Sequence, residues 1–130
     1  MKLGAGLAGA SRVFDKGRKM GYRASHRFAR LSARKAGLVM EMIRGLDLEE
    51  ALQVLDLSRQ RAAKLVVKVV RSAMANADER EADLEALYVL EARAEQGPAY
   101  KRVMPRARGS ADVLRRPTCH LVVELEERKA

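Results

Sequence analysis

Residues 97–118, GPAYKRVMPRARGSADVLRRPT, decide the fold of this chain. They contain six basic residues, one acidic residue and all three prolines of the sequence. Their few apolar residues follow no clean period, so this stretch has no core of its own to bury. Apolar residues alternate as in strands on both sides, over residues 86–94 and 119–125. Two strands joined through Pro and Gly predict one long hairpin.

We call residues 97–118 the arm. From residue 97 to a tip near Ala107 the arm has about ten residues, which would reach ~33 Å at ~3.3 Å per residue. A domain of this size has a radius of only ~14 Å, so we expect the arm to project from it. An isolated two-stranded hairpin is marginally stable in water. A hairpin this basic therefore needs a partner along its length, and a polyanion fits it best.

Positive charge is concentrated in two parts of the chain. The formal net charge is +9, with a balance of +9 over residues 1–40, −4 over residues 41–96 and +5 over the arm. Clustered Lys and Arg are typical of proteins that bind nucleic acid. The alternative is a generic solubilising surface, but such surfaces usually mix the two signs.

The chain has 130 residues, which is enough for one domain with a modest core. We expect a single α+β RNA-binding domain over residues 22–130, preceded by a flexible basic extension over residues 1–21. The extension contains GAGLAG, which matches the pattern G-x-G-x-x-G. No strand can precede Gly4 and no βαβ unit follows, so this match predicts no dinucleotide site.

The expected location is the cytoplasm. Cys119 is the single cysteine, which excludes an internal disulfide and fits a reducing compartment. No apolar run approaches the ~20 residues that a membrane span needs. An Arg-rich transit peptide is the alternative interpretation of the N-terminal segment, whose small-residue run is too weakly hydrophobic for a secretory signal.

Residues 22–30, YRASHRFAR, alternate in part and predict a first strand with one basic face. Successive side chains of a strand point to opposite sides of the sheet. The two expected faces are Tyr22, Ala24, His26 and Phe28 on one side and Arg23, Ser25 and Arg27 on the other.

A first helix is predicted between Ser32 as its N-cap and Gly45 as the glycine that follows its end. The buried face is expected to consist of Ala36, Val39, Met40 and Ile43. Arg34 and Lys35 fall in the first turn, where the helix dipole disfavours cations by a few tenths of a kcal/mol. A phosphate docked at the helix N-terminus would explain this placement. The alternative is a solvent-exposed turn with a small penalty.

Two more helices are predicted, over residues 48–55 and 59–78. The first begins with Asp47 and Glu50 at capping-box spacing, and Ser58 is the expected cap of the second. Their buried faces are expected to be Leu48, Ala51, Leu52 and Leu55, and then Ala62, Val66, Val69, Ala73 and Ala77. The last helix also has a basic stripe, formed by Arg61, Lys64, Lys68 and Arg71. This stripe is either a second contact surface or a solvated face.

The sequence offers no catalytic constellation. His26 and His120 lie far apart and neither has metal-ligand spacing, so both are expected to be sheet residues. Cys119 has apolar neighbours and is expected to serve packing. No P-loop, HExxH or CxxC motif occurs. We therefore predict a protein that is not an enzyme and that holds no cofactor and no metal.

The binding interpretation favours RNA. Tyr100 is the only aromatic residue of the arm, and an Arg-rich, aromatic-poor surface favours recognition of RNA shape and backbone over base stacking. Ala107 and Gly109 would keep the tip thin enough for a narrow space.

Several strings resemble one known family. The string GPAYKRVMPRARGSAD, followed by TCHLVVEL, is similar to the hairpin of the large-subunit ribosomal protein family "L twenty-two", close to its bacterial type. The strings LSARKAGLVMEMIRG, LEEALQVL and RQRAAKLVVKVVRSAMANA agree in order and spacing. The resemblance covers about residues 22–128.

The resemblance implies an α+β fold, with three helices packed on a small three-stranded antiparallel sheet and a long protruding β-hairpin. It also implies a structural constituent of the large ribosomal subunit that binds 23S ribosomal RNA and supports subunit assembly. The hairpin would line the nascent-peptide exit tunnel near the macrolide site, with its tip near ribosomal protein "L four". The implied partners are this RNA, other large-subunit proteins and the nascent peptide, with no membrane and no small-molecule substrate.

The residues expected at the RNA are the basic ones of the first strand, of the first helix turn and of the arm. They are Arg23, Arg27, Arg30, Arg34, Lys35, Lys101, Arg102, Arg106, Arg108, Arg115 and Arg116. The expected tunnel-lining tip is Met104, Pro105, Arg106, Ala107, Arg108, Gly109, Ser110, Ala111 and Asp112. The chain departs from the family at Ser110 and Val113, where a basic residue is frequent, and at Pro117, which interrupts the returning arm.

Two other function classes compete with this one. A free-standing RNA-binding regulator or chaperone would use the same charge but would act away from the ribosome. An RNA-modifying enzyme would need a pocket of acid and base groups that the sequence does not supply. Sedimentation of a cell lysate separates the first two, because a ribosomal protein is recovered with large subunits.

Overall fold

The computed structural model describes residues 21–128. Apart from Gly21, the extension expected over residues 1–21 lies outside the described residues. Two short 3-10 helices, η1 and η2, accompany three helices and five strands in this part of the chain. In order, the elements are β1 (Tyr22–Ala29), α2 (Ala33–Ile43), α3 (Leu48–Leu57), α4 (Arg61–Glu79), η1 (Leu84–Ala86), β2 (Leu87–Gln96), β3 (Tyr100–Pro105), η2 (Ala107–Gly109), β4 (Ala111–Arg116) and β5 (Cys119–Glu127).

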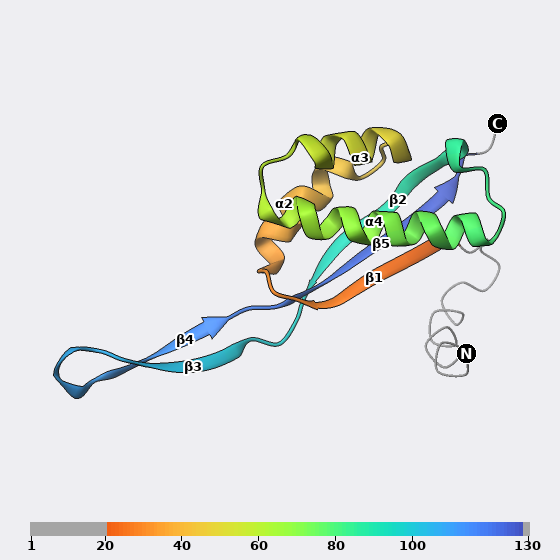
Figure 1. Ribbon diagram of the computed structural model, residues 1–130. Helices are drawn as coiled ribbons and strands as arrows, with labels where there is room; N and C mark the ends of the chain where they lie inside the picture. The colour runs from red at the N-terminus through yellow and green to blue at the C-terminus, as the bar shows by residue number, and fades with distance from the viewer. Residues whose placement is uncertain (1–20, 129–130) are drawn as a thin grey trace, which may run out of the picture.

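The α+β fold is confirmed. Strands β1, β5 and β2 form an antiparallel sheet in that order, and β3 and β4 form a separate antiparallel pair. The three helices cover one face of the three-stranded sheet, and the β3–β4 pair extends away from the domain as a twisted arm (Figure 1). Helix α4 packs on β1 and β5, and α2 packs on β2.

The core lies between the helices and the sheet and consists almost wholly of aliphatic side chains. Its largest fully buried members are Met40, Ile43, Leu87, Leu121 and Leu125. All predicted inner residues of α2 and of α4 are buried, and Leu52 of α3 is the one predicted inner residue that is only half-buried. Alanines on α4 let this helix approach the sheet closely, so a modest volume of side chains fills the layer.

Helix α2 begins and ends as predicted. The Ser32 hydroxyl accepts a hydrogen bond from the Lys35 N–H at 3.3 Å. Gly45 follows the last turn with φ +83°, a conformation that glycine adopts without steric cost.

Helix α3 begins at Leu48 after Asp47, as predicted, whereas the predicted start of α4 is wrong. Asp47 makes no side-chain cap to α3, because its carboxylate pairs with the Arg128 guanidinium at 2.9 Å. Ser58 ends α3 instead of starting α4, since its N–H bonds the Val54 and Leu55 carbonyls. Gln60 then stands at the N-cap of α4 without a side-chain bond.

The long hairpin is confirmed, with a break at its base. Strands β2 and β5 pair as far as Gln96 and Cys119, and pairing resumes at Tyr100 and Arg116. Pro98 and Pro117 lie in the gap and have no N–H to donate. The Gly97 N–H donates to the Thr118 carbonyl at 2.9 Å across the gap.

The predicted face of β1 is wrong at Phe28. His26 pairs with Leu121 and Ala29 with Cys119, so Arg27 and Phe28 bulge out opposite the single residue between those partners. Ala29 takes the buried position, and Phe28 is 50% exposed. A second bulge lies between Val89 and Glu91 of β2. It shifts the alternation by one residue, so that Val89 before the bulge and Ala92 after it both face the core.

None of the helices between residues 21 and 128 is long and apolar enough to cross a membrane.

Candidate nucleic-acid interface

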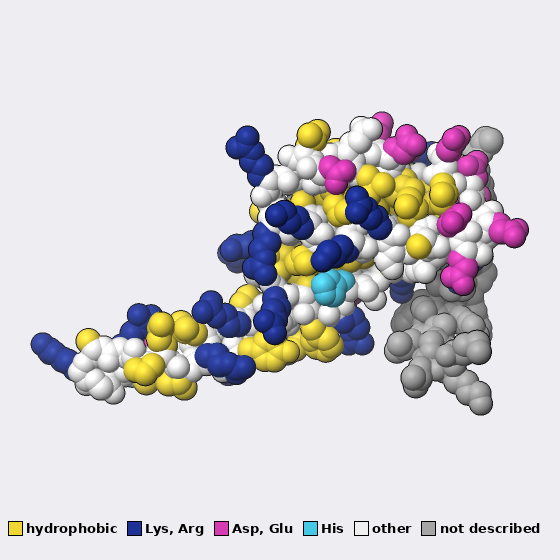
Figure 2. Space-filling model, viewed as in Figure 1, with side chains coloured by type: hydrophobic (Ala, Val, Ile, Leu, Met, Phe, Trp, Pro, Cys, Tyr) yellow, Lys and Arg dark blue, Asp and Glu magenta, His cyan; other side chains and the backbone are white. Residues whose placement is uncertain are grey.

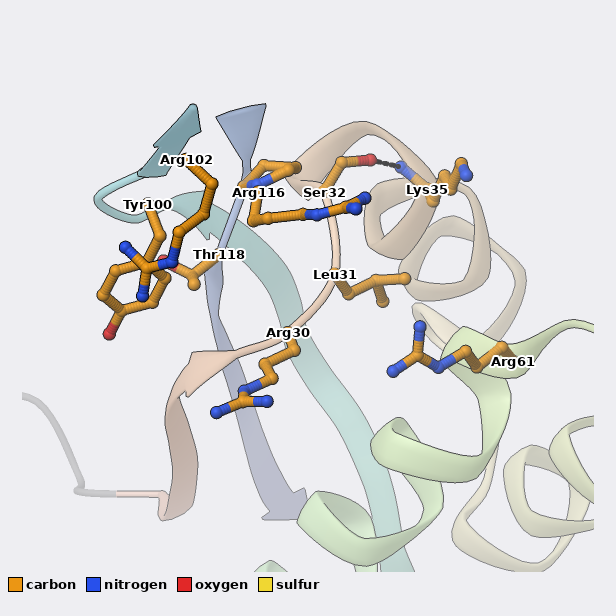
Figure 3. Close-up of a pocket in the computed structure, with 10 residues that line it drawn as sticks. Arg30, Leu31, Ser32, Lys35, Arg61, Tyr100, Arg102, Arg116 and Thr118 are labelled. Atoms are coloured by element: carbon orange, nitrogen blue, oxygen red, sulfur yellow. Dashed lines mark hydrogen bonds between the residues drawn. The ribbon is translucent and has the colours of Figure 1, made fainter. Parts of the chain in front are cut away.

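A basic cleft lies where the arm leaves the domain (Figure 3). Its volume is about 830 Å³. The lining comes from the β1–α2 connection, the first turns of α2 and α4, and the base of the arm. The lining residues are Arg30, Leu31, Ser32, Lys35, Arg61, Tyr100, Arg102, Arg116, Pro117 and Thr118. Five of them are basic and none is acidic, so the cleft is suited to an anion.

The start of α2 contributes partial positive charge to this cleft. Ser32 and Lys35 both line it, and the Ser32 cap occupies only one of the N–H groups of the first turn. The remaining N–H groups of a first turn have no partner within the helix and attract anions. Arg34 lies in the same turn and is exposed. The phosphate-docking interpretation of this turn therefore gains a geometric basis.

The two faces of the arm differ at its base. Tyr100 pairs with Arg116 and Arg102 with Leu114, and three of these four residues line the cleft. On the opposite face, Lys101 pairs with Arg115, followed towards the tip by Val103 and Val113. Every residue of the arm strands is exposed except Leu114, which is half-buried. The arm is thus a two-stranded ribbon with cations on both faces of its basal half.

The tip turns tightly and holds one ion pair. The Arg106 guanidinium lies 2.9 Å from the Asp112 carboxylate, and the Arg106 N–H donates to the Ser110 carbonyl at 2.7 Å. Arg108 and Gly109 have φ of 60° and 74°, which folds the backbone back on itself. The structure records no ion pair for Arg108 among the residues it describes, so its charge remains available to a partner.

Charge is segregated along the molecule. Lys and Arg gather along the arm and on the end of the domain from which the arm leaves, whereas Asp and Glu gather towards the opposite end (Figure 2). The surface in this view therefore has a basic end and an acidic end. Such a distribution orients the basic end towards a polyanion.

The family described as Ribosomal protein L22p/L17e matches residues 24–126. This span includes nearly all of the sheet, the three helices and the whole arm. The chain belongs to this family. Membership confirms the resemblance found in the hairpin and helix strings. It implies a structural, non-enzymatic role in the large ribosomal subunit, with ribosomal RNA and the ribosome as partners.

In this L22-family protein, the predicted RNA-binding residues divide into two groups. Arg30, Lys35, Arg102 and Arg116 meet in the cleft. The others lie outside it. Arg23 faces Glu124 across the sheet at 3.4 Å, and the Arg27 guanidinium stands 5.5 Å from the centre of the Phe28 ring.

Sequence reasoning missed two members of the cleft, Arg61 and Tyr100. Arg61 was part of the α4 stripe whose role stayed open, and it extends from α4 into the same space as the arm residues (Figure 3). No pattern in the sequence relates residue 61 to residue 116, because only the tertiary fold brings the two segments together. Lys64, Lys68 and Arg71 are exposed but do not line the cleft.

Two titratable groups away from the cleft have a raised pKa. Burial raises the pKa of the Cys119 thiol, which is fully buried under the helices as predicted. A hydrogen bond from the Tyr22 hydroxyl to Glu127, at 2.9 Å, raises the pKa of Tyr22. Among residues 21–128 no group of His, Cys, Asp and Glu is arranged to hold a metal ion. The cleft itself offers five basic side chains to an anion.

Proposed function

We propose that this protein binds 23S ribosomal RNA through the basic cleft and the arm, and that the arm lines the nascent-peptide exit tunnel. The observation that carries the proposal is the convergence of five basic side chains from separate segments on one cleft without an acidic residue. Lys and Arg in such a site neutralise phosphates and release counterions. Family membership makes ribosomal RNA the polyanion in question.

In this proposal the domain anchors the protein and the arm extends inward. Phosphates occupy the cleft and follow the basal half of the arm, along Lys101, Arg102, Arg115 and Arg116. The tip, residues 104–112, lies at the tunnel wall near the macrolide site and near ribosomal protein "L four". The tight turn and small side chains of the tip support passage through a narrow space, and Arg108 is the cation that the tip offers.

The wider proposal is a cytoplasmic ribosomal protein that supports assembly of the large subunit. A single RNA-binding domain spans residues 22–130, and the basic residues before it add a further electrostatic contact. The arm has no core of its own, so it becomes ordered only when RNA folds around it. Ordering of the arm is therefore coupled to assembly of the subunit.

Salt dependence of RNA binding tests the cleft. Each phosphate contact that is lost lowers the slope of log K against log[salt] by about 0.7–0.9. The triple variant Arg30→Gln, Arg102→Gln, Arg116→Gln should therefore lower the slope by about 2 with 23S ribosomal RNA. The matched control, Lys64→Gln, Lys68→Gln, Arg71→Gln, removes the same charge outside the cleft. Equal effects of the two variants would contradict the proposal.

The free-standing regulator differs in where the protein is found. Recovery of the protein only with large subunits after sedimentation of a lysate supports the ribosomal role. A substantial pool that sediments with other RNA, free of ribosomal subunits, would favour the regulator.

A further inference from the structure

Phe28 is an exposed aromatic side chain at the edge of the basic surface, and neither the core nor the cleft uses it. We propose that Phe28 is a stacking platform for one unpaired nucleotide of the bound RNA, positioned by His120 and Arg27. This inference rests on the proposed RNA-binding function and adds a base contact to what the sequence predicted as recognition of shape and backbone alone.

The backbone places Phe28 outside the sheet. Arg27 and Phe28 occupy the bulge between His26 and Ala29, and Phe28 has φ 60°. This conformation is uncommon for any residue other than glycine and unfavourable for a bulky one. Glycine would adopt this backbone conformation at lower cost, so the backbone alone does not explain an aromatic residue at this position. Strain of this kind is concentrated at functional sites.

Three contacts hold Phe28, one at its backbone and two at its ring. The Phe28 N–H donates to His120 Nδ1 at 3.1 Å. The Phe28 and His120 rings meet edge to face, with centroids 5.0 Å apart and an interplanar angle of 90°. The Arg27 guanidinium carbon lies 5.5 Å from the Phe28 centroid. A ring that is held on several sides and still 50% exposed loses little conformational entropy when a flat ligand stacks on it.

The platform adjoins the cleft and the root of the arm. Arg30, two residues after Phe28, lines the cleft. His120 lies against Gly97 at the arm root, where an added Cβ would be 3.3 Å from His120 Cε1. Phosphates held in the cleft would therefore bring neighbouring bases within reach of the ring.

The charges around the ring favour a nucleotide over a protein side chain. Arg27 and Arg30 flank Phe28 in sequence, and unpaired bases stack on aromatic rings and on Arg guanidinium groups. Across the sheet, the acidic residue Glu95 pairs with His120 in the ladder. Its carboxylate lies 2.8 Å from the Arg93 guanidinium in an ion pair, so it is neutralised locally.

The chain contains no Trp, which permits a direct optical test on the full-length protein. The variant Phe28→Trp supplies one indole at the platform, and Leu57→Trp supplies one at an exposed position on α3 as the control. Each is titrated with a short oligoadenylate and with an abasic ribose–phosphate chain of the same length. We expect the oligoadenylate, and not the abasic chain, to quench the emission of Phe28→Trp, with no such difference for Leu57→Trp.

A second variant measures the energy of stacking. Phe28→Ala should weaken oligoadenylate binding about tenfold and leave abasic-chain binding unchanged. An unchanged thermal unfolding midpoint would show that Phe28→Ala is folded and that the loss of affinity comes from stacking. If Phe28→Ala fails to fold, Phe28→Leu takes its place. The stacking proposal is overturned if the oligoadenylate and the abasic chain quench Phe28→Trp equally, or if the folded variants lose no affinity for the oligoadenylate. Either result leaves the proposed RNA binding intact. Failure of the wild type to bind 23S ribosomal RNA under the same conditions overturns the proposed function itself.

Discussion

The hydroxyl of Thr118 should stabilise the junction between the arm and the domain, and Thr118→Val removes it with little change of shape. Thr118 is the one polar residue that is buried within residues 21–128, with 1% of its surface exposed. Its Oγ1 donates to the Pro98 carbonyl, in the gap where neither Pro98 nor Pro117 has an N–H for the ladder. Without the hydroxyl the Pro98 carbonyl would lose this donor, and because Pro98 is exposed, water could take its place at the carbonyl.

A typical intramolecular hydrogen bond contributes about 0.5–1.5 kcal/mol net to stability. The added methyl group of Val returns at most ~0.8 kcal/mol of transfer free energy. The net loss of unfolding free energy should therefore be on the order of 0.5–1 kcal/mol. For a domain of about 100 residues this lowers the thermal midpoint by roughly 4–8 °C for each kcal/mol.

Urea unfolding of the RNA-free protein gives the free energy directly, provided that the m-value is unchanged. Thr118→Ser serves as the control, because it keeps the hydroxyl and loses a single methyl group. Amide exchange at Gly97, whose N–H bonds the Thr118 carbonyl, reports whether the junction opens. A Thr118→Val variant as stable as the wild type, with Gly97 equally protected, would refute this account of the junction.

Three further outcomes follow from local features. Ser32→Ala should cost α2 about 0.5–2 kcal/mol of unfolding free energy, because the Lys35 N–H loses its cap, and Ser32→Thr should retain most of that energy. Native Cys119 should react with a disulfide reagent only on unfolding. Because burial raises the pKa of Cys119, the folded state holds the thiol proton more tightly than the unfolded state does. The contribution of this thiol to stability should therefore be constant below the ordinary thiol pKa. It should decline as the pH rises above that value. Rapid labelling of the folded protein would contradict both statements. In the RNA-free protein, amides of residues 97–118 should exchange faster than those of the β2–β5 ladder, since the arm strands are exposed on both faces, and equal protection would show that the arm is stable alone.

The sequence predicts most of the fold because the signals for helices and strands are local. The spacing of Ala36, Val39, Met40 and Ile43 is enough to place the inner face of α2, and all four residues are buried. The alternation in residues 119–125 likewise places Cys119, Leu121, Val123 and Leu125 on the core face. In these segments local propensity and tertiary packing agree.

The errors arise where a distant residue competes for a local group. Asp47 has the spacing of a helix cap, but Arg128, at the far end of the chain, takes its carboxylate. Phe28 continues an alternation, but the pairing of Ala29 with Cys119 requires a bulge that turns Phe28 outward. Neither outcome follows from a pattern within a few residues.

The candidate site is predictable only in part for the same reason. Charge counts identify the arm and the start of α2, and Arg30, Lys35, Arg102 and Arg116 do meet in the cleft. Arg61 joins them only because α4 packs on β1 and β5 and so presents its first turn at the root of the arm.

The most direct test of the central claim is crosslinking from the tip of the arm within purified ribosomes. A photo-reactive group is placed at Met104 or at Arg108 and tested against ribosomal RNA and a stalled nascent peptide. We predict crosslinks to both, because the tip would form part of the tunnel wall. Crosslinks to surface RNA alone, with none to the nascent peptide, would contradict the tunnel role.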